Sequence, residues 1–263
     1  MLLEGTTLSR DDHQRSPTED GLVDRVAGSI AETKGIVLAA FSGQNIDRFV
    51  TFYKAARKAR RSFVADFYLA RLLHALNRRS LPDPTGPALR VYLPHANKRK
   101  IVRSGRFHLV APYRARRIYP AELRSRAGSL MMSFRASMAR ELEGAECLAG
   151  GKLIYSMWPG YLERGEPDLR AWCRRHDLGF EIVHTSGHAD FYDLMRLVKR
   201  VSPRRLIPIH TLAPDRFESF GPEIASLRDG ECSQSMQDDS GMPKTKSTHT
   251  EGDSPALQLP RHQ

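Results

Sequence analysis

The chain has 263 residues, 40% of them hydrophobic, which allows one large or two modest domains with a buried core. It carries 41 Lys and Arg against 30 Asp and Glu, a net charge of +11. No run of about 18 apolar residues occurs, which excludes a membrane-spanning helix, and the first ten residues do not resemble a secretory signal. Three cysteines without C-x-x-C spacing argue against a disulfide framework and favour a reducing compartment, the cytoplasm.

Positive charge gathers in clusters between residues 54 and 117. The clustered residues are Lys54, Arg57, Lys58, Arg60, Arg61, Arg78, Arg79, Lys98, Arg99, Lys100, Arg103, Arg106, Arg114, Arg116 and Arg117. Such clusters suit a polyanion, because each neutralised phosphate releases condensed counterions. We therefore expect RNA or DNA as a partner. The alternative is a solvated basic surface without a ligand.

The first residues, Met1 to Leu3, are apolar and predict a buried strand, which Glu4 follows. Taken alone, Glu4 could be a surface acid at a frayed terminus.

Strands and helices alternate from residue 18 to residue 76. The expected elements are a capped helix that Gly35 ends, a buried strand at 36–41, a helix at 42–59, a strand at 62–65 and a helix at 66–76. This alternation predicts a doubly wound parallel sheet, and therefore an α/β fold.

The pattern continues less regularly beyond a loop at 82–87. We expect strands at 89–93, 129–134, 152–157 and 180–184, and helices at 137–143 and 167–177. Met131 and Met132 are expected to pack in the core rather than to contact a metal. Residues 229–263 are rich in Ser, Asp, Gly, Pro, Thr and Gln, and this composition predicts a disordered tail.

Two histidines bracket a helix and a strand near the end of the ordered sequence. His188 precedes an amphipathic helix on which Leu194, Leu197, Val198 and Val201 form one face, and His210 follows a strand at 204–209. Helix starts and strand ends meet at one rim of an α/β sheet, so both histidines can face one cleft. Either could instead be structural, and Asp190 is the better candidate for the helix cap.

Four signatures in this order resemble the metallo-β-lactamase-fold nucleases of the β-CASP group, which include ribonuclease J. They are E-G-T at Glu4, S-x-Q-N-x-D-R from Ser42 to Arg48 with Asp66 after the next strand, W-x-G-Y from Trp158, and S-G-H-A at His188 with P-I-H at His210. The resemblance covers roughly residues 1–220. It implies four regions: the end of a first metallo-β-lactamase segment (1–20), a Rossmann-like β-CASP domain (21–165), a closing metallo-β-lactamase and RNA-specificity segment (166–228) and the tail (229–263).

The resemblance also implies roles for individual residues. His210 would be the last ligand of a zinc centre, His188 would protonate the leaving oxygen, and Glu4 would hold the imidazole of His188. The substrate-binding positions implied are Ser186, Gly187, Asn45, Arg48 and Asp66. Asp66 could equally cap the helix that follows it.

One departure from the family pattern changes the functional expectation. The ten histidines include no H-x-H pair, so most zinc ligands of the family are absent from this chain. We expect a carboxyl-terminal portion of a zinc-dependent phosphodiester hydrolase, weak or inactive alone, with the rest supplied by a missing N-terminal half or a second copy. The alternative is a noncatalytic nucleic-acid-binding module that keeps the basic face. An unrelated nucleotide-binding enzyme is disfavoured, because neither G-x-x-x-x-G-K-[ST] nor G-x-G-x-x-G occurs.

Overall fold

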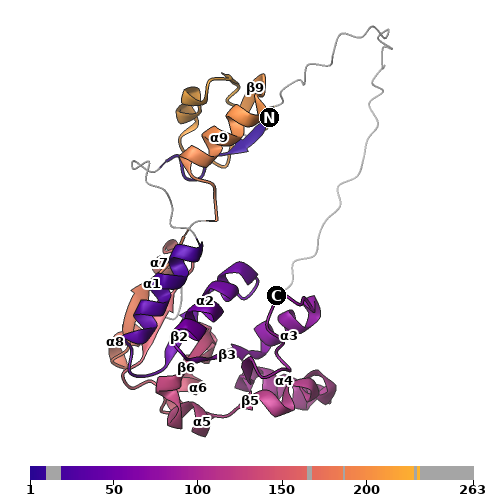
Figure 1. Ribbon diagram of the computed structural model, residues 1–263, viewed down its shortest axis with the longest axis vertical. Coiled ribbons are helices and arrows are strands. Elements are labelled where there is room, and N and C mark those ends of the chain that lie inside the picture. Colours follow the sequence, from indigo (N-terminus) through magenta and orange to yellow (C-terminus); the bar gives the residue numbers. More distant parts are fainter. Residues whose placement is uncertain (10–18, 165–167, 186, 228–229, 232–263) are drawn as a thin grey trace, which may run out of the picture.

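The computed structural model describes residues 1–9, 19–164, 168–185, 187–227 and 230–231, and within them two parallel sheets form (Figure 1). The strands of the larger sheet are β2 (Val37–Ala40), β3 (Ser62–Asp66), β4 (Leu89–Tyr92), β5 (Arg117–Ile118), β6 (Leu130–Phe134), β7 (Lys152–Tyr155) and β8 (Gly179–Ile182). Their order across the sheet is β5-β4-β3-β6-β2-β7-β8. The predicted α/β class with a parallel sheet is confirmed.

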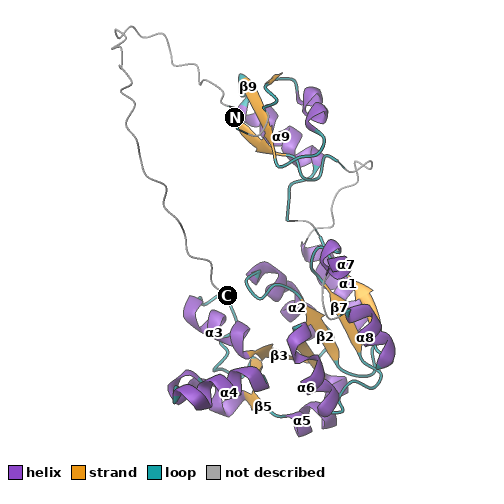
Figure 2. Ribbon diagram, turned by 180° about the vertical axis from the view of Figure 1, so that it is seen from behind, coloured by secondary structure: helices purple, strands orange, loops and turns teal. Residues whose placement is uncertain are grey.

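Helices cover both faces of this sheet (Figure 2). One face carries α1 (Glu19–Ala31), α2 (Ile46–Lys58), α3 (Phe67–Leu76) and α4 (His95–Ser104), and the other carries α5 (Pro120–Ser125), α6 (Ala139–Gly144) and α8 (Leu169–Arg175). Successive strand residues point to opposite faces, so Met131 packs in one apolar cluster and Met132 in the other, as core residues. A sheet buried on both faces explains why its central strands are continuously apolar.

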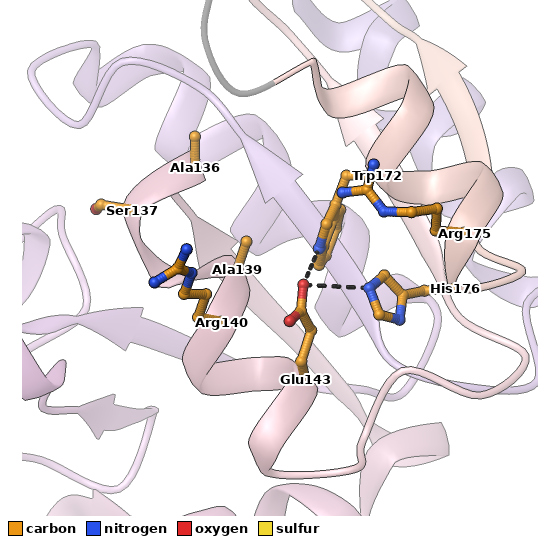
Figure 3. Close-up of a pocket in the computed structure, with 8 residues that line it drawn as sticks. All are labelled: Ala136, Ser137, Ala139, Arg140, Glu143, Trp172, Arg175 and His176. Atoms are coloured by element: carbon orange, nitrogen blue, oxygen red, sulfur yellow. Dashed lines mark hydrogen bonds and ion pairs between the residues drawn. The ribbon is translucent and has the colours of Figure 1, made fainter.

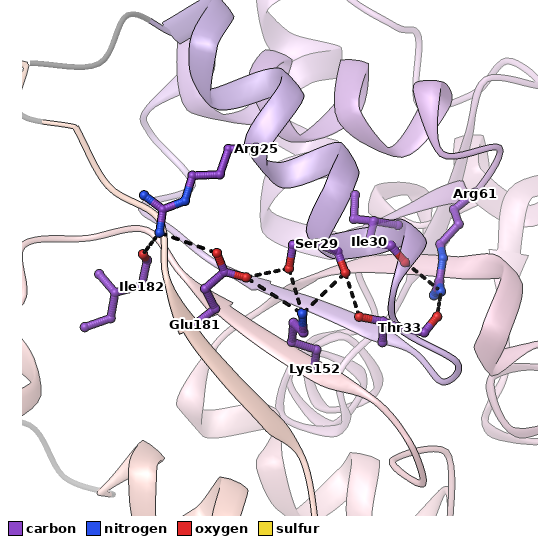
Figure 4. A network of polar contacts seen from close by, with 8 residues as sticks. All are labelled: Arg25, Ser29, Ile30, Thr33, Arg61, Lys152, Glu181 and Ile182. Carbon is purple, nitrogen blue, oxygen red and sulfur yellow. Dashed lines mark hydrogen bonds and ion pairs between the residues drawn. The ribbon is translucent and has the colours of Figure 1, made fainter.

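A buried arginine ties the first helix layer to the sheet (Figure 4). Arg61 lies in the turn between α2 and β3, and its guanidinium donates to the carbonyl oxygens of Gly35 (2.6 Å), Leu130 (3.2 Å), Ile30 (3.2 Å) and Thr33. These carbonyls lie at the end of α1, before β2 and at the start of β6. Arg61 therefore satisfies backbone acceptors that burial would otherwise leave unpaired.

A second polar network connects α1 with the β7–β8 edge of the larger sheet (Figure 4). It consists of Arg25, Ser29, Lys152 and Glu181.

The smaller sheet joins the two ends of the described chain. Its order is β1 (Leu2–Glu4), β9 (Arg205–Ile209) and β10 (Glu223–Ile224), with all strands parallel. Its separate core is supplied by these strands together with α9 (Phe191–Val201) and a 3₁₀ helix, η5 (Pro214–Phe220). A Cβ on Gly5 would lie 2.6 Å from the Phe217 ring, so a larger residue at this position would clash with the core.

The structure differs from what the sequence indicated, or adds to it, in three places. Only Leu194 and Val198 of the predicted apolar face of α9 are buried, whereas Leu197 and Val201 are exposed, because the three-stranded sheet covers a narrow side of the helix. The strand β8, expected in the closing segment from residue 166, extends the larger sheet beside β7. The basic stretch that begins at Asn97 lies mostly within the helix α4, which was not expected.

The predicted disordered tail lies outside the described residues except for residues 230 and 231. Within the described ranges, no helix combines the length and the apolar composition that crossing a membrane requires.

Candidate metal-binding site

The structure brings Glu4, His188 and His210 together, although they are far apart in the sequence. Glu4 is the last residue of β1, His210 follows β9, and His188 lies two residues before the N-cap of α9. The parallel register pairs Glu4 with Ile209, so the carboxyl ends of β1 and β9 deliver Glu4 and His210 to one edge. One potential ligand atom from each of the three residues lies within 4.8 Å of the other two.

Thr6, the threonine of the E-G-T signature, connects the cluster, although the sequence indicated no role for it. The Thr6 hydroxyl donates to Glu4 Oε2 (2.7 Å) or to the backbone oxygen of His210 (3.2 Å), and it lies 3.1 Å from His210 Nδ1. The Thr6 hydroxyl has one proton, which a carboxylate or a carbonyl receives. When that proton goes to Glu4 or to the carbonyl, the Nδ1–H tautomer of His210 can donate to the hydroxyl oxygen.

The same reasoning assigns the protons of His188. Its Nδ1 lies 3.0 Å from Glu4 Oε2, and an ionised carboxylate can only accept a hydrogen bond. Nδ1 of His188 therefore carries a proton, which leaves its Nε2 available for proton transfer, and the Nδ1–H tautomer of His210 likewise leaves Nε2 available for a metal ion. A carboxylate or hydroxyl behind a ligating histidine fixes the tautomer in this way in metal sites.

Glu4 is held in its ionised form. Partial burial raises the pKa of the Glu4 carboxyl. The hydrogen bonds from the Thr6 side chain and backbone and the charge of His188 lower this pKa by more than burial raises it, so it lies below the usual 4.5. Glu4 is therefore a carboxylate at neutral pH.

The cluster is open to solvent and to a ligand. The side chain of His188 is 40% exposed, His210 is exposed and Glu4 is half-buried. The two imidazole rings lie 5.5 Å apart at an angle of 61° between their planes. His210 has a left-handed backbone (φ 50°), which turns the chain away from β9.

The α9 helix begins as the sequence predicted. The Asp190 side chain accepts a hydrogen bond from the backbone N–H of Asp193 (2.9 Å), so Asp190 and not His188 caps the helix. The Thr7 hydroxyl donates to the backbone oxygen of Ala189 (2.6 Å), which ties the segment that carries His188 to the end of β1.

The substrate-binding positions expected from the sequence have structural contacts in the larger sheet. Asn45 caps α2 and accepts from Arg48 N (2.9 Å), and Asp66 caps α3, accepting from Tyr68 N (2.7 Å). The cap confirms one of the two roles that the sequence left open for Asp66, and substrate binding stays a prediction. Asp66 also pairs with Arg135. Gly187 is exposed beside His188, and Ser186 lies outside the described residues.

Arg48 is buried and reaches the segment that leads to His188. Its guanidinium donates to Ser156 Oγ and to the backbone oxygen of Thr185 (3.3 Å). This contact braces the chain three residues before His188.

A separate cavity of about 800 Å³ lies between α6 and α8 on the larger sheet (Figure 3). At its centre, Glu143 accepts hydrogen bonds from Trp172 Nε1 (2.6 Å) and contacts His176 Nε2 (3.1 Å). Arg140 and Arg175 stand on opposite sides. Because Glu143 already serves both neighbours, we regard this arrangement as packing between two helices.

Comparisons with known proteins agree with the fold, and one of them matches the segment that carries the two histidines. A protein of unknown function from Enterococcus faecalis V583, solved as a crystal structure, matches with a TM-score of 0.62 and 22% identity over 88% of this chain. The match covers 50% of that protein, so this chain spans half of its length, and the likeness concerns the fold alone. No curated protein matches the chain. Residues 179–215, which carry both His188 and His210, match the family described as the Zn-dependent metallo-hydrolase RNA specificity domain.

Proposed function

We propose that Glu4, His188 and His210 form part of a zinc-dependent site that hydrolyses phosphodiester bonds of RNA or DNA. The observation that carries the proposal is the convergence of three potential ligand atoms within 4.8 Å, with Nδ1 of His188 lying 3.0 Å from Glu4 Oε2 and Nδ1 of His210 lying 3.1 Å from the Thr6 hydroxyl. The match of residues 179–215 to the Zn-dependent metallo-hydrolase RNA specificity domain supports the choice of metal and substrate.

The residues fit one zinc ion better than two. Imidazole nitrogen is a common zinc ligand, so His210 can contribute one donor to a single ion, with the other positions left for water and for donors from outside this chain. Zinc, when bound, acts as a Lewis acid and lowers the pKa of a coordinated water toward neutrality. In the proposed arrangement His210 contributes Nε2 as a ligand.

The other two residues act on a proton. Because Glu4 keeps Nδ1 of His188 protonated, His188 exchanges its second proton at Nε2, which faces away from Glu4. That nitrogen can protonate the oxygen that leaves when the phosphodiester breaks. Glu4 thereby positions His188 rather than touching the substrate.

We propose that this chain supplies only part of a complete centre. The ten histidines contain no H-x-H pair, and within the described ranges the Glu4 cluster is the one group with metal-ligand geometry. A two-metal centre would need further donors from a second copy or another polypeptide. The chain by itself is expected to hydrolyse RNA weakly or not at all.

Cobalt(II), which can replace zinc and absorbs visible light, tests the site directly. Titration of the full chain should produce an absorption band that His210→Ala abolishes. The control His108→Ala removes an exposed histidine outside the cluster and should leave the band unchanged. No band in the unmodified chain, or an equal band in His210→Ala, would overturn the proposal.

The second candidate is a noncatalytic nucleic-acid-binding module. The observation that favours it is the group of exposed basic side chains on α4, none of which pairs with an acid among the described residues. Such a module would bind RNA and give no cobalt band.

A further inference from the structure

We propose that α4 and the residues after it form a contact surface for single-stranded nucleic acid, separate from the Glu4 cluster. We call it the α4 surface and define it by Lys98, Arg99, Lys100, Arg103, Arg106, Val102 and Phe107. The inference rests on the proposed function only for the class of polymer that is bound. Its own support comes from charge, exposure and position.

The charge of the sequence is concentrated around this helix. Residues 84–121 contain nine Lys and Arg and no Asp or Glu, whereas the whole chain has a net charge of +11. Most of the excess charge of the protein therefore comes from this one segment. A local concentration of this kind produces a strong positive potential, which attracts a polyanion.

The structure leaves these charges exposed and unpaired. Of the residues of α4 only Ile101 is buried, and Lys98, Arg99, Lys100, Arg103 and Arg106 are exposed. In the part of the chain that the structure describes, no ion pair joins any of these five to a carboxylate. Arg99 and Arg103 are one helical turn apart, where like charges repel and destabilise a helix. A bound phosphate backbone would relieve this repulsion.

Exposed apolar side chains lie among the charges. Phe107 is 58% exposed and Val102 is 57% exposed, and a hollow of about 790 Å³ runs along α4 beside His95, Lys98 and Val102. Bases of a single strand stack on exposed rings while arginine and lysine contact the phosphates, whereas a duplex keeps its bases stacked inside. The combination favours a single strand.

A membrane surface fits these residues less well. An interfacial helix needs a continuous apolar face. In α4 the isoleucine is buried against the core, and Val102 is the single exposed large apolar residue of the helix. Anionic lipid is therefore the alternative ligand that the experiment must exclude.

The α4 surface lies at the edge of the larger sheet opposite the one that leads to His188. The helix follows β4 next to the β5 edge, and the chain continues to His188 from β8 at the other edge (Figure 1). Seven strands spaced about 4.8 Å apart span roughly 30 Å, so one nucleotide cannot contact both places. The α4 surface would anchor a strand whose scissile bond lies elsewhere.

The test measures binding of fluorescent oligouridine to the full chain by anisotropy at several salt concentrations. The triple variant Lys98→Gln/Arg99→Gln/Arg103→Gln should bind about tenfold more weakly or worse. It should also reduce the slope of log K against log salt concentration by about 2, because each phosphate contact to a single strand contributes about 0.7. The matched control is Arg140→Gln/Arg174→Gln/Arg175→Gln, which removes the same charge from exposed positions on α6 and at the end of α8. The control should change affinity less than twofold.

A single substitution separates base stacking from charge. Phe107→Ala should weaken binding of oligouridine by about fivefold or more, through lost stacking, and should leave binding of heparin, a polyanion without bases, unchanged. Oligothymidine distinguishes DNA from RNA as the preferred strand. Circular dichroism confirms that each variant is folded.

Equal losses in the triple variant and in its matched control would overturn the inference. So would a triple variant that loses binding to phosphatidylserine vesicles while its RNA affinity is unchanged. Failure of the metal site is distinguishable, because the triple variant should keep the cobalt band and His210→Ala should keep its RNA affinity.

Discussion

Thr6 determines how the two histidines of the candidate site can act. Its hydroxyl lies between Glu4 and His210, and when its single proton goes to Glu4 the hydroxyl oxygen can accept a hydrogen bond from Nδ1–H of His210. The motif that includes Glu4 indicated an acidic residue and not a role for Thr6. The contact depends on the pairing of β1 with β9, which the local sequence does not reveal.

Thr6→Val should weaken metal binding, because it removes the group that orients His210. The expected loss in cobalt affinity is about tenfold, at the low end for partners behind a ligating histidine. Thr6→Ser keeps the hydroxyl and should restore most of the affinity. Equal affinities of Thr6→Val and the unmodified chain would show that the hydroxyl does not orient His210.

Arg61 stabilises the fold by an unusual number of contacts to buried backbone. Arg61→Ala would leave the carbonyl oxygens of Gly35, Ile30, Thr33 and Leu130 without this donor. We expect the free energy of unfolding to fall by about 2–4 kcal/mol, measured by urea denaturation. Arg79→Ala, at an exposed position, should change it by less than about 0.5 kcal/mol. Similar values for both variants would contradict the bridging role.

At the scale of elements, the sequence predicted the alternation from α1 to α3, because each of these helices and strands contains its own apolar pattern. It did not predict α4, since Ile101 is the one buried residue of a helix whose other side chains are mostly polar or basic and whose remaining large apolar residue, Val102, is exposed. The two-residue strands β5 and β10 are also too short to carry a pattern. They form because their backbone groups pair with a neighbouring strand, β5 with β4 and β10 with β9.

The loop between β8 and α9 is held from two sides. Arg48 on α2 contacts the backbone oxygen of Thr185, and Thr7 beyond β1 contacts that of Ala189. His188 lies between these two contacts. The position of His188, the candidate proton donor, therefore depends on a buried arginine of α2, a helix that packs against the larger sheet.

Arg48→Met should loosen this loop while leaving the sheets folded. We expect faster hydrogen exchange in peptides that contain Thr185 and His188, measured by mass spectrometry, because the brace to the backbone oxygen is lost. Arg57→Met changes an exposed arginine of the same helix and serves as the control. Unchanged exchange in Arg48→Met would show that the loop is held by other contacts.

At the scale of the whole molecule, the two sheets differ in how completely they bury their apolar surface. The larger sheet is covered on both faces, whereas the smaller sheet has one small core and leaves Leu2, Leu197, Val201, Ile209 and Leu212 exposed. Leu212, next to the candidate site, is 93% exposed. Exposed apolar side chains beside unpaired strand edges are typical of surfaces that bind another chain.

We therefore expect the chain to associate with itself as its concentration rises. Light scattering after size exclusion should show a growing mass, and Leu197→Gln/Leu212→Gln should reduce it by removing apolar area from the contact. Val102→Gln changes another exposed apolar side chain, on α4, and should have no effect on self-association. A monodisperse monomer at all concentrations would contradict this expectation.

The measurement that tests the central claim most directly is the zinc stoichiometry of the purified chain, obtained by calorimetric titration together with elemental mass spectrometry. With His210 as the zinc ligand beside Glu4 and His188, the site predicts one weakly held zinc ion per chain, which a chelator removes and which His210→Ala fails to bind. Two tightly held ions, the absence of saturable binding, or equal binding by His210→Ala would each contradict the account.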